Sequence, residues 1–213
     1  MSLYKLELDK VFFDGKELTK IDFQTFQILG QFLAKDKSHI YKGGEILDYV
    51  DYDTFEFINE NYAKDKNNIY YLNILTHDEL SDYYAVSVIE GVDSKTFKLL
   101  GDHYYIDKDS VYYKERKITY ASRDSFEYIS YSYAKDEKYV YMDGAAILGA
   151  NPKNIQVLSD SYIKDSENVF NGYKKIEGVD VGSFEVIGGQ YAKDKNSGYH
   201  FFKKVSFEEL TKI

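Results

Sequence analysis

The sequence predicts an all-β protein made of tandem repeats of about 29 residues, each built from short antiparallel strands. Two observations carry this prediction: a motif that recurs at a fixed step, and a composition rich in tyrosine and phenylalanine. The chain has 213 residues with 23 Tyr and 14 Phe, but no Trp and only one Pro. Aromatic residues favour strands, and a fixed period of this length is typical of repeat proteins.

A lysine-aspartate turn motif sets the period. The aspartate position of the repeat falls at Asp36, Asp65, Asp107, Asp136, Asp165 and Asp194, with steps of 29, 42, 29, 29 and 29 residues. A second, mostly aromatic marker keeps the same steps at Phe26, Phe55, Phe97, Phe126, Ile155 and Phe184. We therefore expect a single repeat array over residues 1–213, with six to seven units and an insertion near residues 72–85.

Each unit opens with two polar positions just before the marker. They are Asp22 and Thr25 in one copy and Asp51 and Thr54 in the next. Side chains of these types hydrogen bond to nearby backbone N–H groups. They predict an Asx or Ser/Thr turn, or one turn of 3₁₀ helix.

Short strand-like segments complete the unit. Residues 55–58 alternate between apolar and polar, which indicates a strand with one covered face. Residues 62–64 and 69–71 flank a polar turn and predict a tight hairpin, and a further turn and apolar segment follow, giving about three strands. Such units bury their faces by stacking in a meander or a solenoid-like array. A β-propeller-like arrangement is the alternative, although its blades usually need ~40 residues.

The composition excludes several function classes. The net charge is −9, and the 25 lysines are spread among acidic residues with only Arg116 and Arg123 beside them, so no nucleic-acid partner is expected. The lack of cysteine excludes thiol chemistry and cysteine-bound zinc. No apolar run approaches the ~20 residues of a membrane span. No cofactor is expected.

The insertion holds the densest set of ionisable groups, namely His77, Asp78, Glu79 and Asp82. Insertions in repeat proteins map to loops on one face, and such loops often bind partners. These four residues form a candidate interaction loop, although an ordinary solvated acidic loop has the same composition. No catalytic, cofactor-binding or metal-binding residues are assigned elsewhere. The recurring aspartates are interpreted as turn formers rather than calcium ligands, because each turn offers only one or two carboxylates.

Tyrosines fall into two groups. Those at recurring positions are expected in the core. Tyr83, Tyr84, Tyr120 and Tyr131 lie outside those positions and predict an exposed aromatic surface, which favours protein or glycan contacts.

The residues Asp65-Lys66-Asn67-Asn68-Ile69-Tyr70-Tyr71, preceded by Tyr62-Ala63-Lys64, resemble the repeat motif of the bacterial DKNYY family. Weaker copies lie at residues 107–113 and 136–141, and the first copy departs with Glu7 in the aspartate position. The resemblance implies a bacterial protein of a family without a known function, some members being associated with the cell envelope. It supplies no catalytic residues.

These observations favour a non-enzymatic protein-interaction or structural module whose partner is another protein or a cell-surface component. The alternative is a carboxylate-based, glycosidase-like hydrolase with a site near residues 72–85, which needs paired carboxylates about 5–10 Å apart. No signal peptide is visible, but the opening Met1-Ser2-Leu3 is compatible with a leader having been replaced. Envelope, secreted and cytoplasmic locations all stay open, as does the oligomeric state.

Overall fold

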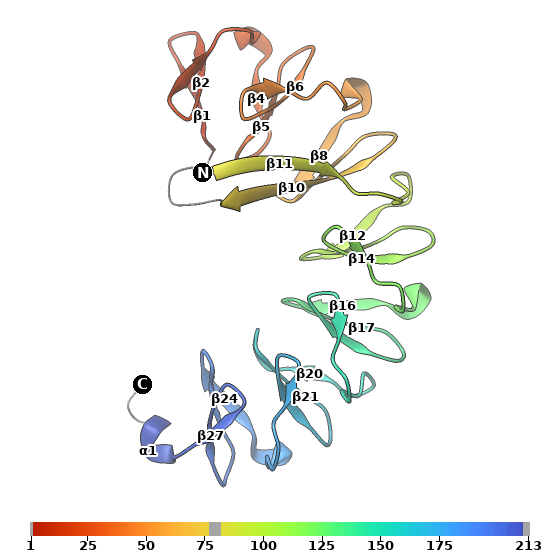
Figure 1. The fold of residues 1–213 in the computed structure, drawn as a ribbon, viewed down its shortest axis with the longest axis vertical. Helices are drawn as coiled ribbons and strands as arrows, with labels where there is room; N and C mark the ends of the chain where they lie inside the picture. The colour runs from red at the N-terminus through yellow and green to blue at the C-terminus, as the bar shows by residue number, and fades with distance from the viewer. Residues whose placement is uncertain (1, 77–81, 211–213) are drawn as a thin grey trace. The chain divides into compact units, whose positions relative to one another are not determined.

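The computed structural model describes residues 2–76 and 82–210 and is almost entirely β (Figure 1). Its strands form seven small antiparallel sheets. The chain divides into two compact units, Met1–Phe97 and Lys98–Ile213, here called the N-terminal and the C-terminal unit. The all-β tandem-repeat prediction is confirmed. The single continuous array stays a prediction.

The N-terminal unit contains three sheets. Its elements are β1 (Tyr4–Glu7), β2 (Lys10–Phe13), β3 (Lys16–Leu18), η1 (Phe23–Thr25), β4 (Gln27–Ile28), β5 (Leu33–Lys35), β6 (Ile40–Lys42), β7 (Glu45–Ile46), η2 (Tyr52–Thr54), β8 (Glu56–Asn59), β9 (Tyr62–Lys64), β10 (Ile69–Thr76) and β11 (Asp82–Val88).

The C-terminal unit contains four sheets. Its elements are β12 (Lys98–Gly101), β13 (Tyr104–Ile106), β14 (Val111–Tyr113), β15 (Arg116–Lys117), η3 (Arg123–Ser125), β16 (Glu127–Ser130), β17 (Tyr133–Lys135), β18 (Val140–Met142), β19 (Ala145–Ala146), β20 (Gln156–Val157), β21 (Tyr162–Lys164), β22 (Val169–Asn171), β23 (Lys174–Lys175), η4 (Val181–Ser183), β24 (Glu185–Gly188), β25 (Tyr191–Lys193), β26 (Gly198–His200), β27 (Lys203–Val205) and the short helix α1 (Phe207–Leu210).

Each sheet is an open meander in which consecutive strands are neighbours, for example β12-β13-β14-β15. The first sheet has three strands and the other six have four, and none of these described sheets closes into a barrel. The expected number of about three strands per unit is therefore one too low. The additional pairing comes from both outer segments of the unit, which are only two to four residues long in most sheets but still join the ladder.

The turn before each marker forms as the polar positions predict. Asp22, Asp51 and Asp180 each accept a hydrogen bond from the backbone N–H three residues later and so cap η1, η2 and η4. The hydroxyl of Thr25 or Thr54 then accepts a bond from the backbone N–H of Lys37 or Lys66, in the turn of the following hairpin. This second bond joins the start of each unit to its central hairpin.

The central strands are buried on both faces. A tyrosine on the third strand lies directly opposite an alanine on the second in four sheets: Tyr41 and Ala34, Tyr70 and Ala63, Tyr141 and Ala134, Tyr199 and Ala192. All eight residues are at most 1% exposed. The small alanine leaves room for the ring, because protein interiors are close-packed. In the fourth sheet Tyr105 replaces the alanine and stacks on Tyr112, with ring centroids 5.0 Å apart.

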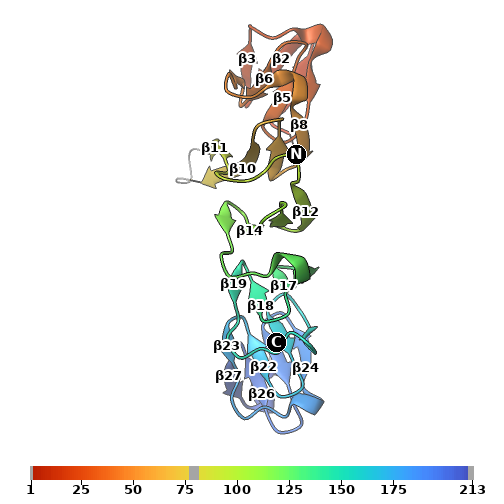
Figure 2. The same ribbon diagram turned by 90° about the vertical axis from the view of Figure 1, so that its right-hand side faces the viewer.

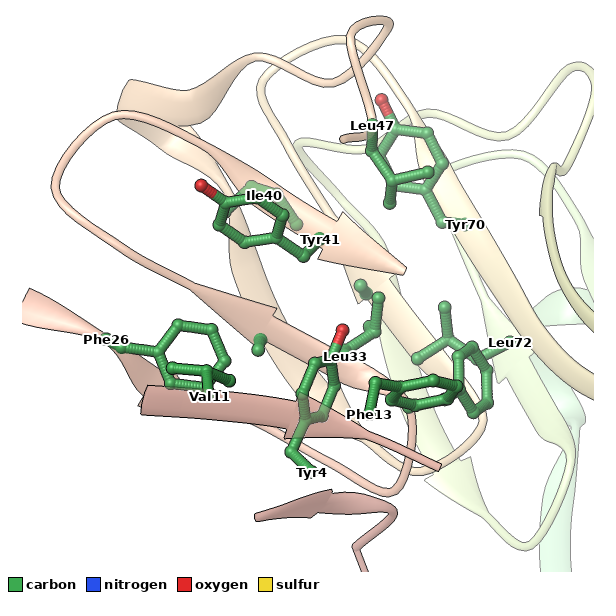
Figure 3. Packing of buried hydrophobic residues seen from close by; sticks show 13 residues of the cluster. Tyr4, Val11, Phe13, Phe26, Leu33, Ile40, Tyr41, Leu47, Tyr70 and Leu72 are labelled. Carbon is green, nitrogen blue, oxygen red and sulfur yellow. The ribbon is translucent and has the colours of Figure 1, made fainter. Parts of the chain in front are cut away.

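Neighbouring sheets share a core in the N-terminal unit. Tyr4 and Phe13 pack edge to face with centroids 4.8 Å apart, and Phe26, Tyr41 and Leu72 belong to the same cluster (Figure 3). The Tyr4 hydroxyl accepts a 2.9 Å hydrogen bond from the Gly44 backbone N–H in the next sheet. Buried polar groups usually find such partners, so the recurring tyrosines also tie sheet to sheet.

The described part of the chain ends in a small capping arrangement. Ser206 donates through its backbone N–H and its hydroxyl to Glu209, and the Glu209 N–H donates back to the Ser206 hydroxyl. This reciprocal pattern is a capping box. Within residues 2–76 and 82–210, no helix is long and apolar enough to cross a membrane.

Candidate functional site

The insertion lengthens a β-hairpin. Strands β10 and β11 pair from Tyr70 opposite Val88 to Thr76 opposite Asp82. Of the candidate interaction loop, His77, Asp78 and Glu79 lie outside the described residues, and only the backbone of Asp82 is described, at the start of β11. The binding role of these four residues stays a prediction.

The base of this hairpin belongs to the core of the N-terminal unit. The Tyr84 ring stacks on Phe32 with centroids 5.0 Å apart and meets the edge of Phe13 at 5.5 Å. Tyr49 donates from its hydroxyl to the Val86 carbonyl at 3.1 Å. The expectation that Tyr84 lies on an exposed aromatic surface is therefore wrong, because it covers apolar side chains of the two preceding sheets.

The other tyrosines of that group are on the surface where the structure describes them. Tyr120 is 50% exposed and Tyr131 is 56% exposed, as predicted, and the side chain of Tyr83 lies outside the described residues. Tyr120 is flanked by the rings of Tyr139 and Tyr141, with centroids about 6 Å away.

The recurring aspartates form the most regular polar site of the molecule. In one copy, Oδ1 of Asp65 accepts hydrogen bonds of 2.8 Å from the backbone N–H groups of Asn67 and Asn68. Its Oδ2 accepts from the Asp51 N–H at 2.8 Å and from the Tyr70 hydroxyl at 2.5 Å. One buried carboxylate therefore closes the hairpin turn and holds the start of its own unit against it.

The same pattern recurs at Asp36, Asp136 and Asp194, each of which accepts hydrogen bonds from three backbone N–H groups and a tyrosine hydroxyl. Asp36 accepts one more from the Ser38 hydroxyl. At Asp165 the tyrosine is replaced by Phe170, and the side-chain amide of Asn168 donates to Asp165 instead, at 3.3 Å. The Asn168 amide thus supplies a side-chain donor to the carboxylate in the repeat that lacks the tyrosine hydroxyl.

These bonds set the charge state of the site. Burial raises the pKa of Asp136, but its hydrogen bonds to Ser122, Tyr141, Tyr139 and Lys138 outweigh burial and lower the pKa below its ordinary value of 3.8. Burial and the carboxylate partner raise the pKa of Tyr112 and of Tyr199 to about 12. The site therefore keeps an ionised carboxylate beside a neutral phenol, which is an arrangement that holds structure together.

Histidines and acidic groups build no further chemical cluster in the described ranges. His39, His103 and His200 lie in different sheets, and each packs against a tyrosine ring. No group of three or more His, Asp or Glu side chains that could hold a metal ion occurs among the residues whose placement is described. The aspartate oxygens are occupied by N–H and O–H donors, which supports the turn interpretation over calcium ligation.

Two grooves occupy equivalent places in the two units. One has a volume of about 410 Å³ and lies between β3 and β7, beside Lys16, Glu17, Gly44 and Glu45. The other has a volume of about 210 Å³ and lies between β15 and β19. Its corresponding residues, exactly 100 positions later in the chain, are Arg116, Lys117, Gly144 and Ala145.

A local backbone feature repeats with the grooves. Gly44 and Gly144 both have positive φ, and a Cβ added at either would come within 2.6 Å of a neighbouring side chain. Their N–H groups donate to the hydroxyls of Tyr4 and Tyr104, respectively, at 2.9 Å. The grooves are thus made by the same packing, while their charged walls differ.

Comparisons with known proteins give one match. A family model described as the DKNYY family matches residues 3–74 and 75–202. Neither the curated proteins nor the solved structures yield a match to the chain. The two matched segments cover nearly all of the chain, and the Asp-Tyr pairs of the structure are built from the aspartate and tyrosine of the repeat motif. The chain is thus a member of the DKNYY family.

Proposed function

We propose that this protein is a non-enzymatic interaction module, in which the recurring motif builds a scaffold and the outer strands present a binding surface. The observation that carries the proposal is the use of the recurring carboxylates. In the copies at Asp36, Asp65, Asp136 and Asp194, both oxygens are taken by donors of the same repeat. The motif residues therefore serve the fold, and differences between repeats are left to the surface.

The surface supports this proposal in two ways. The charges at equivalent groove positions differ. Glu17 in one groove corresponds to Lys117 in the other, and Glu45 corresponds to the uncharged Ala145. Tyr120 and Tyr131 are half exposed, and tyrosine is enriched at protein interfaces. A protein partner fits these features better than a small substrate, because both grooves lie between outer strands and the groove beside β15, at about 210 Å³, is smaller than a usual small-molecule site of roughly 300–1,000 Å³.

The test is quantitative affinity capture with the full chain, using membrane and soluble extracts of a bacterium that encodes it. An unrelated acidic β protein serves as the control bait. The expected result is a protein retained by the chain alone, which then binds the purified chain at a defined stoichiometry in calorimetry. Failure of every captured protein to bind in the purified pair would overturn the proposal.

The glycosidase-like alternative has its own test. The purified chain is incubated with a panel of bacterial polysaccharides, and released reducing ends are measured. Turnover that disappears in both Glu79→Gln and Asp82→Asn would establish the hydrolase and overturn the interaction module. The expected result is that the wild type releases no more reducing ends than a variant that carries both Glu79→Gln and Asp82→Asn.

A further inference from the structure

The outermost strands of the C-terminal unit carry pairs of cations. In three sheets the fourth strand carries such a pair: Arg116 and Lys117 on β15, Lys174 and Lys175 on β23, and Lys203 and Lys204 on β27. All six side chains are exposed, and we call this set the basic edge. Strands β19, β23 and β27 follow one another along one edge of the unit in Figure 2, and β15 is the corresponding fourth strand of its own sheet. The cation pairs are far apart in sequence but occupy the same strand of the repeat.

The two units differ in charge. Residues 1–97 contain 10 Lys and 18 Asp or Glu, for a net charge of −8. Residues 98–213 contain 17 Lys or Arg and 18 Asp or Glu, for a net charge of −1. The C-terminal unit is thus close to neutral, so its exposed cations are opposed by less negative charge than those of the N-terminal unit.

Aromatic rings alternate with the cations of the basic edge. The Lys174 ammonium lies over the Phe202 ring, 4.0 Å from its centroid. The Tyr173 hydroxyl donates to the Met142 carbonyl of the preceding sheet at 2.7 Å. Burial and the nearby Asp143 carboxylate raise the pKa of the Tyr173 hydroxyl, and Arg116 is close enough to oppose them. Tyr120, Tyr173 and Phe202 are each 39–50% exposed.

The groove beside β15 is the part of the basic edge with a defined shape. Arg116 and Tyr120 stand on its walls, and Gly144 and Ala145 line its other side. Its volume of about 210 Å³ is below the usual size of a small-molecule site, roughly 300–1,000 Å³. It suits one side chain of a larger partner.

We infer that the basic edge, centred on the groove at Arg116, Lys117 and Tyr120, binds an acidic peptide segment of a partner protein. The inference deepens the proposed function and rests on it. A guanidinium group binds a carboxylate through two parallel hydrogen bonds. Arginine and tyrosine are also the side chains that most often anchor protein interfaces. A long polyanion such as nucleic acid is disfavoured, because its affinity comes from many phosphate contacts and the whole chain carries −9.

The equivalent groove of the N-terminal unit provides an internal control. It has Lys16 in place of Arg116, but Glu17 and Glu45 replace Lys117 and Ala145. Glu17 and Glu45 offset Lys16 and Lys20 in its lining, and Glu17 is already paired with Lys10 at 2.9 Å. This groove therefore carries no excess of positive charge and is expected not to bind an acidic segment.

The experiment titrates the full chain into a fluorescently labelled oligoglutamate peptide and follows fluorescence anisotropy. We expect one binding site, with affinity that falls as salt rises. Arg116→Glu combined with Lys117→Glu is expected to weaken binding at least about tenfold, while Lys16→Glu leaves it unchanged. Glu17→Lys combined with Glu45→Ala is expected to create a second site. Circular dichroism checks that each variant is folded. A variant with both Lys174→Ala and Lys175→Ala is also expected to bind the peptide more weakly than the wild type.

Unchanged affinity in the Arg116→Glu, Lys117→Glu variant would overturn the inference, as would an equal loss in Lys16→Glu. Tighter binding of single-stranded DNA or of an anionic polysaccharide than of oligoglutamate would also overturn it. The proposed function is tested separately. A captured protein that binds the wild type and the Arg116→Glu, Lys117→Glu variant equally would leave the interaction module standing and reject the basic edge as its site.

Discussion

The Tyr70 hydroxyl donates a 2.5 Å hydrogen bond to Oδ2 of Asp65, and both groups are buried. The tyrosine is on strand β10 and the aspartate begins the turn before it, five residues earlier. The same pair recurs as Tyr41 with Asp36, Tyr112 with Asp107, Tyr141 with Asp136 and Tyr199 with Asp194. The recurring aspartate and tyrosine of this chain therefore act together as one structural unit.

Removing the charge of one aspartate is expected to destabilise the fold. Asp136→Asn leaves one side-chain oxygen and adds two N–H donors where only donors are present, so at least one bond to Ser122, Lys138, Tyr139 or Tyr141 is lost. We expect a cost of about 1.5–3 kcal/mol, the range for hydrogen bonds to a charged group. Urea denaturation measures it. Asp124→Asn, whose side chain is 94% exposed, is the matched control and is expected to change stability by less than ~0.5 kcal/mol.

The Phe170 repeat shows how the tyrosine can be replaced. Tyr141→Phe removes one donor from Asp136 and is expected to cost about 1–2 kcal/mol. Asn168 supplies the side-chain donor at Asp165, and Tyr139 occupies the same position three residues after Asp136. Tyr139→Asn in the Tyr141→Phe background is therefore expected to recover part of the loss. A further loss in this double variant would show that the amide does not substitute for the phenol.

Stability is expected to depend on acid pH. The pKa values of Asp36, Asp65, Asp136, Asp165 and Asp194 are lowered in the fold, because their hydrogen bonds outweigh the opposing effect of burial. A carboxyl with a lowered folded pKa stabilises the fold above its unfolded value of 3.8 and loses this contribution as pH falls through the folded pKa. The urea midpoint is expected to stay level between pH 7 and about pH 5 and to fall steeply below about pH 4. A midpoint that begins to fall near pH 6 would point to other groups.

Alanine substitutions at two glycines distinguish the cost of backbone strain from the cost of side-chain crowding. Gly144 and Gly149 both have positive φ, of 76° and 86°. An added Cβ meets Tyr113 Cβ at 2.6 Å at Gly144 but nothing within 4 Å at Gly149. Gly149→Ala is expected to cost about 1–2 kcal/mol for the backbone alone. Gly144→Ala is expected to cost roughly 1–3 kcal/mol more, because the neighbouring sheet must move. Equal losses in thermal unfolding would show that the sheets give way easily there.

The base and the tip of the insertion are expected to behave differently. Thr76 lies directly opposite Asp82, so residues 77–81 can be replaced by a two-residue Asn-Gly turn that keeps the hairpin paired. The free energy of unfolding of this variant is expected to lie within ~0.5 kcal/mol of the wild-type value. Tyr84→Ala is expected to cost about 2–4 kcal/mol, since it uncovers Phe32 and Phe13. Comparable losses in the two variants would mean that residues 77–81 also support the fold.

Much of the fold follows from short sequence patterns, because turns and strands depend on residues that are close together in the chain. The recurring aspartates and the polar residues before each marker predict turns, and the short apolar runs between them predict strands. The 3₁₀ turns at Asp22, Asp51 and Asp180 and the hairpin at Asp65 form where expected. The number of strands was underestimated because a two-residue strand such as β7 has no periodicity to detect.

The sequence by itself determined the repeat, the turns, the strands and the family, because each depends on residues that are close together in the chain. Only the tertiary structure decided which side chains meet across repeats. Tyr84 covers Phe32, more than 50 residues earlier, although nothing local distinguishes it from the exposed Tyr120. Likewise, the meander of each sheet places Arg116, Lys174 and Lys203 on its outermost strand, although 29 or more residues separate them. Contacts between repeats depend on how whole sheets pack, and that information is distributed over the core rather than held in any one segment.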